Sequence, residues 1–479
     1  MKRVSLIALT YFFSFPLFSQ ELATARFISD TALKHASVSV CIADALTGEA
    51  VYEHNSSVSS VPASVMKLIT TAVAIEMLGP DYTFTTHIGF SGKIDTISKV
   101  LSGNIIIKGG GDPSLGSVNF SENYNDFLRS WVNEIKKLGI KKIEGSVISD
   151  DSYYDYRPTP SKWLWEDIGN YYGAGAYGLS VFDNLYEIHL KSTSGSPAPV
   201  IKEIIPAEYE PEILNHLRAS GTADYGNIFS SPYGTSATME GIIPAGQNDF
   251  VLKASISDPP LLLAKIMTKM LNSAGITLTE EPSTARLVKN YNPDDFSLIT
   301  ETVSPPLSKI IEVLNHESVN LYAEHLLKEL GKKYGTAGST YAGIEVVMSF
   351  LRKNGIDNSG LYMEDGSGLS PLDAINTRLL SNVLSYMETS GKYFGDYFSS
   401  LPEAGKNGTI KYHFTDPIFD NRLRAKSGSM TRVRNYAGYL TTIKGNKLVF
   451  SIIVNNFSGS SGQIVAGVEN ILRQTIINK

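Results

Sequence analysis

Two residues that could act as a nucleophile and its base lie three positions apart in the chain. In Ser64-Val65-Met66-Lys67 the hydroxyl and the amine share one face of a predicted helix, because residues at this offset are neighbours on a helix surface. A lysine can take the proton of a serine when burial or a nearby cation lowers the pKa of the lysine. The same residues are equally compatible with a serine that caps a helix, followed by a solvated lysine.

Ser318-Val319-Asn320 adds a second hydroxyl and an amide, again on a predicted helix. Other serine–asparagine pairs at this spacing lie beside predicted turns, and the helical setting distinguishes Ser318 from them. Taken alone, the pattern favours a polar pair on an exposed helical turn.

Lys426-Ser427-Gly428 precedes a predicted pair of strands near the end of the chain. An ammonium group at a strand edge can bind a carboxylate, and the small Ser427 and Gly428 leave room for an extended peptide to pair with the strand. Alone, this pattern favours an ordinary turn before a strand. The three patterns in this order, the first at a helix start and the last at a strand, form the set typical of penicillin-recognising serine enzymes.

The elements that must position these patterns come from both ends of the chain. Residues 36–52 alternate like a β-hairpin, and residues 64–78 form an apolar helix. Further along, the patterns predict helices over 307–331, 338–354, 376–387 and 462–477, and strands over 434–442 and 447–455. We therefore expect one α/β domain over residues 20–85 and 296–479.

The stretch between these two parts has a different character. Residues 86–295 are rich in short strands and turns, which is typical of an insertion into the main domain. We expect this inserted region to divide into two subdomains, in line with a chain of 479 residues that holds two or three domains.

Composition excludes several classes of function. The formal net charge is −6, so no basic surplus is available to bind a nucleic acid or an anionic membrane surface. Cys41 is the only cysteine, which excludes an intramolecular disulfide and cysteine-based metal sites. No H-E-x-x-H motif is present. We therefore expect neither a metal nor another cofactor.

The first residues have the pattern of a secretion signal. Lys2 and Arg3 precede an apolar run over residues 4–18, and cleavage could follow Ser19 or Ala25. We expect residues 1–19 to be a signal peptide and the mature protein to be periplasmic. An uncleaved anchor is the alternative, although the run is shorter than the roughly 20 residues of a spanning helix. No later segment is expected to cross a membrane.

Along nearly all of the mature chain, the sequence resembles the low-molecular-mass class C penicillin-binding proteins, which are D-alanyl-D-alanine carboxypeptidase/endopeptidases. Besides the three motifs, the matching segments are residues 103–113, 304–307, 320–324, 365–370 and 401–405. The resemblance implies a penicillin-binding transpeptidase-like domain, an antiparallel sheet flanked by helices, with a large insertion between the first two motifs.

The resemblance also implies a role for each motif. Ser64 would attack the carbonyl between two D-alanines of a peptidoglycan stem peptide, and Lys67 would accept the proton of Ser64. Ser318 and Asn320 would relay a proton to the leaving amine and orient the peptide. Lys426 would hold the terminal carboxylate and help to keep Lys67 neutral. We accordingly expect a lowered pKa for Lys67, caused by desolvation and by Lys426.

The substrate-binding residues are implied in the same way. Ser427, Gly428 and Ser429 would line the bound peptide, with the backbone N–H groups of Ser64 and Ser429 around the oxyanion. For a substrate that contains diaminopimelate, Asp167 would pair with the side-chain ammonium, beside Tyr172.

The counterpart for the diaminopimelate carboxylate is less obvious. Some members of the family carry an arginine where this chain has Pro371, and Arg378 is a candidate substitute. A solvent-facing carboxylate near a structural tryptophan remains an alternative role for Asp167.

Two other functions share these motifs. A β-lactamase would differ by fast hydrolysis of its acyl-enzyme, and a non-catalytic wall-binding protein would lack acylation. The long insertion favours the peptidase over the β-lactamase, and the intact motifs argue against the non-catalytic protein. β-Lactams are expected to inhibit a peptidase of this class, whereas the sequence leaves the oligomeric state open.

Overall fold

The computed structural model describes residues 19–120, 126–193 and 198–479. Residues 1–18 of the expected signal peptide lie outside the described residues. Within the described part of the chain, no helix has the length and apolar character needed to cross a membrane.

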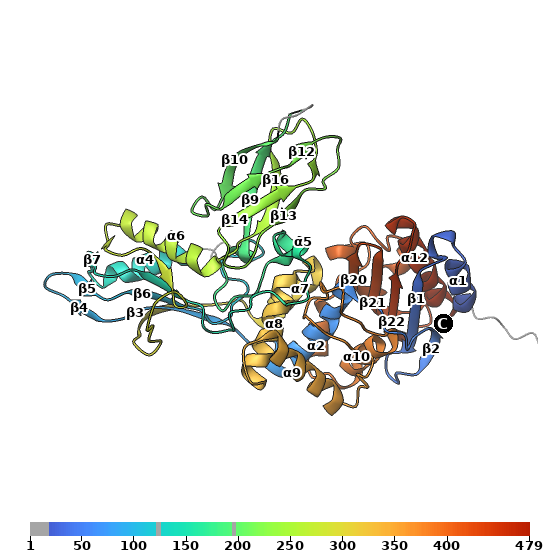
Figure 1. The fold of residues 1–479 in the computed structure, drawn as a ribbon. Helices are drawn as coiled ribbons and strands as arrows, with labels where there is room; N and C mark the ends of the chain where they lie inside the picture. The colour runs from blue at the N-terminus through green and yellow to red at the C-terminus, as the bar shows by residue number, and fades with distance from the viewer. Residues whose placement is uncertain (1–18, 121–125, 194–197) are drawn as a thin grey trace, which may run out of the picture.

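A five-stranded antiparallel sheet joins the two ends of the chain (Figure 1). Its strands, in spatial order, are β2 (Ala50–His54), β1 (Ser37–Asp44), β22 (Lys447–Asn455), β21 (Val433–Thr441) and β20 (Leu423–Met430). Strand β1 pairs with β22 over eight residues, from Ser37 with Asn455 to Asp44 with Leu448. This sheet confirms the expected fold, in which both chain ends build one α/β unit.

Helices cover both faces of this sheet because its central strands are apolar on both sides. On β22, Val449 and Ile453 belong to one hydrophobic core, whereas Phe450 and Ile452 belong to the other, as the two-residue period of a strand requires. Helices α1 (Ser19–Ile28) and α12 (Ser461–Asn478) pack on one face. The other face carries α2 (Lys67–Leu78), α7 (Leu307–Glu317), α8 (Asn320–Tyr334), α9 (Thr340–Lys353), α10 (Thr377–Ser390) and α11 (Phe394–Ser399).

The first part of the inserted region has its own sheets and core. One sheet has the order β18 (Ser283–Thr284), β8 (Val147–Asp150), β6 (Ile105–Lys108), β3 (Thr85–Phe90) and β19 (Ser297–Val303). The other has β17 (Thr277–Leu278), β7 (Lys142–Ile143), β5 (Val100–Ser102) and β4 (Lys93–Asp95). Helices α4 (Phe127–Lys137) and α6 (Pro259–Ser273) pack into the same core. Because β19 pairs with β3, this strand belongs to the sheet of the insertion although it follows residue 296.

A second core lies in the upper lobe of Figure 1. It contains the strands β9 (Leu185–Lys191), β10 (Val200–Ile205), β11 (Glu212–Asn215), β12 (Arg218–Ala219), β13 (Asn227–Phe229), β14 (Ser236–Glu240), β15 (Ile242–Ile243) and β16 (Phe250–Ser255). The region is strand-rich, as expected, and it has two separate hydrophobic cores.

One local prediction near the motifs was wrong, and another holds with a change of helix type in its first turn. The single helix expected over 307–331 is broken at Ser318, whose φ of 60° and ψ of 38° place it in the left-handed region between α7 and α8. The helix expected from Ser64 begins as a 3-10 turn, Ala63–Met66, and becomes α-helical at Lys67. As a result, neither Ser64 nor Ser318 lies within a regular α-helix.

Candidate active site

The hydroxyl of Ser64 and the amine of Lys67 are in contact at the start of α2. Lys67 Nζ lies 2.9 Å from Ser64 Oγ, 2.5 Å from Asn320 Oδ1 and 2.8 Å from the backbone oxygen of Ser367. The side chain of Lys67 is completely buried. Segments from three distant parts of the chain therefore meet at one amine.

These three contacts define what Lys67 can do. A neutral amine has two N–H groups and one lone pair, whereas oxygens of carbonyl and amide groups only accept hydrogen bonds. Asn320 Oδ1 and the Ser367 carbonyl can take the two N–H groups, which leaves the lone pair for the hydroxyl of Ser64. The arrangement suits a base that removes the proton of Ser64.

Burial adjusts the basicity of this amine. Desolvation lowers the pKa of Lys67 to about 7, against the opposing effect of the buried carboxyl groups of Asp365, Glu324 and Asp373. The expected lowering is thus confirmed, with burial as its main cause. Lys426 is not among the groups that shift the pKa of Lys67. Instead, burial and, to a smaller degree, Lys67 lower the pKa of Lys426 well below its usual range.

Ser318 and Asn320 reach the site from the break between α7 and α8. Lys426 Nζ donates to Ser318 Oγ at 2.8 Å, and Asn320 Nδ2 donates to the backbone oxygen of Tyr172 at 2.8 Å. The second of these bonds determines which end of the Asn320 amide faces Lys67. The left-handed conformation of Ser318 lets two residues of one motif contact two different lysines.

The third motif lies on β20, the strand at one edge of the sheet. Ala425 donates to the carbonyl of Pro402, so the segment before Lys426 is covered on its outer side. Ser427 Oγ lies 2.7 Å from Thr409 Oγ1, and Ser429 is exposed. The edge next to the Ser64 turn therefore presents hydroxyl groups and backbone for an extended peptide.

Close packing explains two glycines around the nucleophile. A Cβ at Gly428 would lie 2.7 Å from the carbonyl oxygen of Pro62 and 3.0 Å from the nitrogen of Ser64. A Cβ at Gly368, whose φ is +80°, would lie 2.0 Å from the carbonyl oxygen of Ala63. The Ser64 turn is held between β20 and the loop of residues 365–370, and neither neighbour tolerates a side chain at that point.

Asp167 and Tyr172 lie together in the inserted region, next to the catalytic groups. Asp167 is in α5 (Trp165–Ile168) and Tyr172 in the 3-10 turn Tyr171–Gly173, whose backbone accepts the hydrogen bond from Asn320. Burial raises the pKa of Asp167, and the hydrogen bond from the Tyr172 hydroxyl opposes this shift. The backbone of Tyr172 therefore touches the motif residue Asn320, and substrate binding by Asp167 and Tyr172 stays a prediction.

The structure contradicts the suggestion for Arg378. This side chain forms an ion pair with Glu53 on β2, at the opposite edge of the sheet from β20. At about 4.8 Å per strand, four strand spacings separate the two edges. Arg378 lies in the first turn of α10, which packs over β1 and β22, so it cannot bind a group held at β20.

Three contributors to the site escaped prediction from the sequence. Ser367 acts through its backbone carbonyl, Thr409 touches Ser427, and Glu324 is buried behind the loop of residues 365–370. The segment around Ser367 matches the family pattern, which is a signal that could have drawn attention to it. A backbone acceptor has no side-chain signature, and nothing in the sequence distinguishes Thr409 from other loop threonines.

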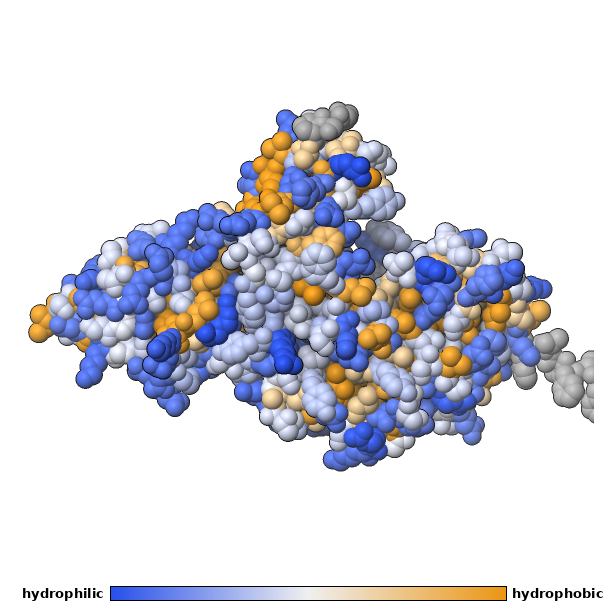
Figure 2. Space-filling model, viewed as in Figure 1, coloured by the Kyte–Doolittle hydropathy of each residue, from blue (hydrophilic) through white to orange (hydrophobic). Residues whose placement is uncertain are grey.

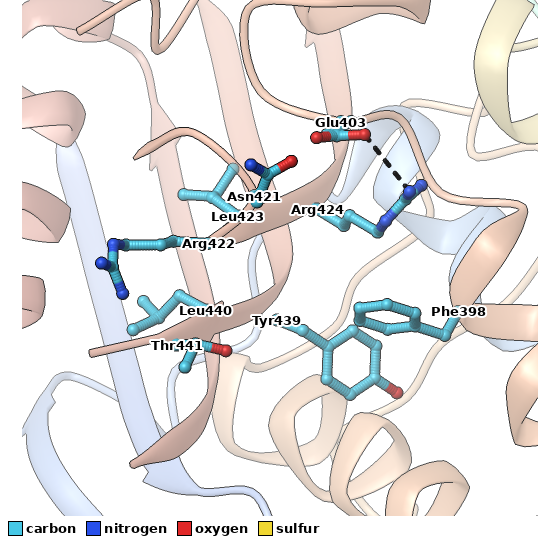
Figure 3. A pocket seen from close by; sticks show the side chains of 9 residues that line it. All are labelled: Phe398, Glu403, Asn421, Arg422, Leu423, Arg424, Tyr439, Leu440 and Thr441. Carbon is cyan, nitrogen blue, oxygen red and sulfur yellow. Dashed lines mark hydrogen bonds and ion pairs between the residues drawn. The ribbon is translucent and has the colours of Figure 1, made fainter. Parts of the chain in front are cut away.

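A separate cavity of about 270 Å³ lies at the start of β20 (Figure 3). Arg424 extends toward Glu403 in this view and donates to the carbonyl oxygen of Leu401 at 2.9 Å. Phe398 and Tyr439 line the other side of the cavity. None of the motif residues lines this cavity, so it is distinct from the candidate active site.

The fold and the site together define a serine hydrolase of the penicillin-binding class. The profile of the D-Ala-D-Ala carboxypeptidase 3 (S13) family matches residues 20–473, and the chain belongs to this family.

Similar proteins come from several organisms. The chain is 28% identical to a D-alanyl-D-alanine carboxypeptidase of an Actinomadura species over 447 residues, covering 90% of this chain and 80% of that relative. It is 25% identical to the D-alanyl-D-alanine carboxypeptidase DacB of Haemophilus influenzae over 415 residues, covering 85% and 83%. The crystal structure of penicillin binding protein 4 from the same organism superposes with a TM-score of 0.81 at 22% identity, covering 95% of this chain and 99% of that one.

Proposed function

We propose that this protein is a D-alanyl-D-alanine carboxypeptidase and endopeptidase that acts on peptidoglycan stem peptides and their cross-links through an acyl-enzyme on Ser64. The observation that carries the proposal is the buried contact of Lys67 with Ser64, Asn320 and the Ser367 carbonyl. Membership of a D-Ala-D-Ala carboxypeptidase family supports the same bond specificity.

In the acylation step, Lys67 removes the proton of Ser64 while Ser64 Oγ attacks the carbonyl carbon between the two D-alanines. A pKa of about 7 leaves a large fraction of Lys67 neutral at neutral pH. The backbone N–H groups of Ser64 and Ser429 stabilise the oxyanion, in keeping with the position of β20 against the Ser64 turn.

Collapse of the tetrahedral intermediate expels the amine of the terminal D-alanine. Ser318 Oγ donates its proton to that nitrogen, with the hydrogen bond from Lys426 orienting the hydroxyl, and it regains the proton that Lys67 took from Ser64, which leaves Lys67 neutral again. Water then attacks the acyl-enzyme, with Lys67 again as the base, and restores Ser64. The proton count therefore closes over one turnover.

Substrate binding uses the edge of β20. A bound terminal carboxylate next to Lys426 would favour the protonated form of this lysine, and the hydroxyl groups of Ser427 and Thr409 donate to the carboxylate. In the inserted region, Asp167 pairs with the ammonium of a diaminopimelate side chain, next to the Tyr172 ring. This pairing lets the enzyme act on cross-links whose acceptor is diaminopimelate.

We further propose that the protein acts in the periplasm after removal of a signal peptide. The pattern of residues 1–19 supports export, and β-lactams should inhibit the enzyme by acylating Ser64. Ala23 and Phe27 of α1 are buried against α12, which favours cleavage after Ser19 over cleavage after Ala25.

Mass spectrometry of the products from purified cross-linked muropeptides tests the proposed function. We expect loss of one D-alanine from pentapeptides and conversion of cross-linked dimers to monomers. Hydrolysis of a penicillin with many turnovers, without change to the muropeptides, would instead identify a β-lactamase. Absence of both reactions would refute an enzymatic role.

A further inference from the structure

A buried acid lies one helical turn after Asn320 and contacts the loop that accepts a hydrogen bond from Lys67. The carboxyl oxygens of Glu324 on α8 lie 3.0 and 3.2 Å from the backbone nitrogen of Gly366. The next residue, Ser367, supplies the carbonyl oxygen 2.8 Å from Lys67 Nζ. Glu324 is completely buried, so water does not compete for this contact.

The same loop is held from a second helix. Thr70, which follows Lys67 by three residues on α2, donates its hydroxyl to the carbonyl oxygen of Gly366 at 2.7 Å. Glu324 thus holds the N–H and Thr70 holds the C=O of one residue, directly before the carbonyl that faces Lys67. One side chain comes from the helix of Asn320 and the other from the helix of Lys67.

We propose that Glu324 is a positioning residue for the general base: by holding the N–H of Gly366 it aims the Ser367 carbonyl at Lys67, and so directs the lone pair of Lys67 toward Ser64. This inference rests on the proposed function of Ser64 and Lys67. It assigns to α8 a second part in the reaction, one turn away from Asn320.

The direction of the carbonyl matters because Lys67 has three hydrogen-bond partners in a tetrahedral arrangement. If the Ser367 carbonyl turned away, one N–H of the neutral amine would lose its acceptor and would compete for the oxygen of Ser64. The lone pair would then no longer face the proton that it must accept. Displacements of about 1 Å at a reacting group can cost on the order of 100-fold in rate.

Charge alone does not explain the placement of Glu324. The charged groups that influence Glu324 or are influenced by it are Lys67, Asp365, Asp373 and Lys328. Burial and the neighbouring Asp365 raise the pKa of Glu324 to about 8. Asp365 itself accepts hydrogen bonds from the backbone of Ser367, Gly368 and Ser370 and from Trp163. Glutamine keeps the size and the acceptor oxygen of Glu324 without a carboxyl group, so it is the closest uncharged substitute.

Glu324→Gln and Glu324→Leu separate positioning from charge. We expect the rate of acylation by a penicillin, followed by intact-protein mass and expressed per reactive site, to stay within about threefold for Glu324→Gln and to fall by about 30-fold or more for Glu324→Leu. We also expect the pH at which the rate is half-maximal to fall slightly in Glu324→Gln, because Glu324 opposes the lowering of the pKa of Lys67. A purely structural role would reduce the number of reactive sites and leave the rate per site unchanged.

Glu329 provides a matched control on the same helix. It is also completely buried, but it accepts hydrogen bonds from the hydroxyl groups of Tyr82, Tyr153 and Tyr154. We expect Glu329→Leu to lower the melting temperature while the acylation rate per reactive site stays within about threefold.

Thr70→Val gives an independent test if Glu324→Leu does not fold. It removes the other hydrogen bond to Gly366, and we expect a slower acylation per site. A wild-type rate per site in Glu324→Leu or, if that variant is lost, in Thr70→Val would overturn the proposal. Equal losses in Glu324→Gln and Glu324→Leu would also overturn it, in favour of a charge effect. If the unmodified protein is not acylated at all, the proposed function fails instead.

Discussion

Two completely buried lysines, one in the catalytic region and one facing the inserted region, have different surroundings. Lys328 on α8 donates to Asp155 Oδ1 at 2.8 Å and to the carbonyl oxygens of Arg157 and Ala176 at 2.8 and 3.1 Å. Lys67 also has three oxygen partners, but none of them is a carboxylate. Burial lowers the pKa of both lysines, but at Lys328 the charge and the hydrogen bond of Asp155 oppose this shift and favour the cation. Lys67 touches only neutral oxygens, so it can lose its proton.

This contrast extends to the two regions themselves. Around Lys67, two neutral oxygens occupy the contacts that the Ser64 hydroxyl does not, and the acids that influence the pKa of Lys67 are not among its hydrogen-bond partners. In the inserted region, several apolar side chains remain exposed, including Val200, Ile205 and Leu214 on β10 and β11. Figure 2 shows such apolar surface on the upper lobe.

The largest expected effect comes from removal of the nucleophile. Ser64→Ala should abolish the release of D-alanine from a pentapeptide, because no other hydroxyl lies against Lys67 among its described contacts. Circular dichroism and the melting temperature should remain close to those of the unmodified protein. Release of D-alanine by this variant would show that Ser64 is not the nucleophile.

Replacement of each buried lysine by methionine tests the comparison directly. Lys67→Met should lower the acylation rate by about 1000-fold or more, as expected when both proton transfers lose their base. Lys328→Met should instead lower the free energy of unfolding by about 2–4 kcal/mol, because it leaves Asp155 and two carbonyl groups without their partner. Acylation kinetics should show the large loss of rate in Lys67→Met, and chemical denaturation should show the large loss of stability in Lys328→Met. Equal losses of rate per reactive site would remove the distinction between the two lysines.

A smaller effect is expected at the edge of β20. Ser427→Ala should raise KM for a D-Ala-D-Ala peptide by about tenfold, because the terminal carboxylate loses one hydroxyl donor. Thr409→Val should act in the same direction, since its hydroxyl lies against that of Ser427. Steady-state release of D-alanine measures both effects. An unchanged KM in both variants would place the carboxylate elsewhere.

The smallest effect is expected in the inserted region. Asp167→Asn should lower kcat/KM for diaminopimelate-containing peptides by about threefold to tenfold, through the loss of one ion pair with the substrate. The matched control is the same peptide with its side-chain amine acetylated, for which the variant and the unmodified enzyme should be equally active. An equal loss on both peptides would assign Asp167 a structural role.

The sequence predicted the parts of the site that depend on side-chain chemistry and order along the chain. The three motifs and an α/β domain built from both chain ends follow from residue types and from hydrophobic periodicity, whereas the antiparallel order of its sheet was implied by the family resemblance. The break at Ser318 could not be predicted, because residues 307–331 are periodic throughout and only tertiary contacts pull Ser318 toward Lys426.

Contacts between distant segments were likewise beyond prediction. The carbonyl of Ser367 has no side-chain signal, and Arg378 had the right charge for a carboxylate but lies at the wrong edge of the sheet. Such placements depend on how strands are ordered in space, which periodicity along one segment does not specify.

The central claim is that Lys67 is a neutral base for Ser64, and the pH dependence of acylation tests it most directly. The measurement is the rate at which a penicillin forms a single adduct on Ser64, located by peptide mapping and followed from pH 5 to pH 9. A pKa of about 7 predicts a rate that falls about tenfold for each pH unit below 7, as Lys67 becomes protonated, and that levels off above 8. An adduct on another residue, or a rate that does not change across this range, would contradict the claim.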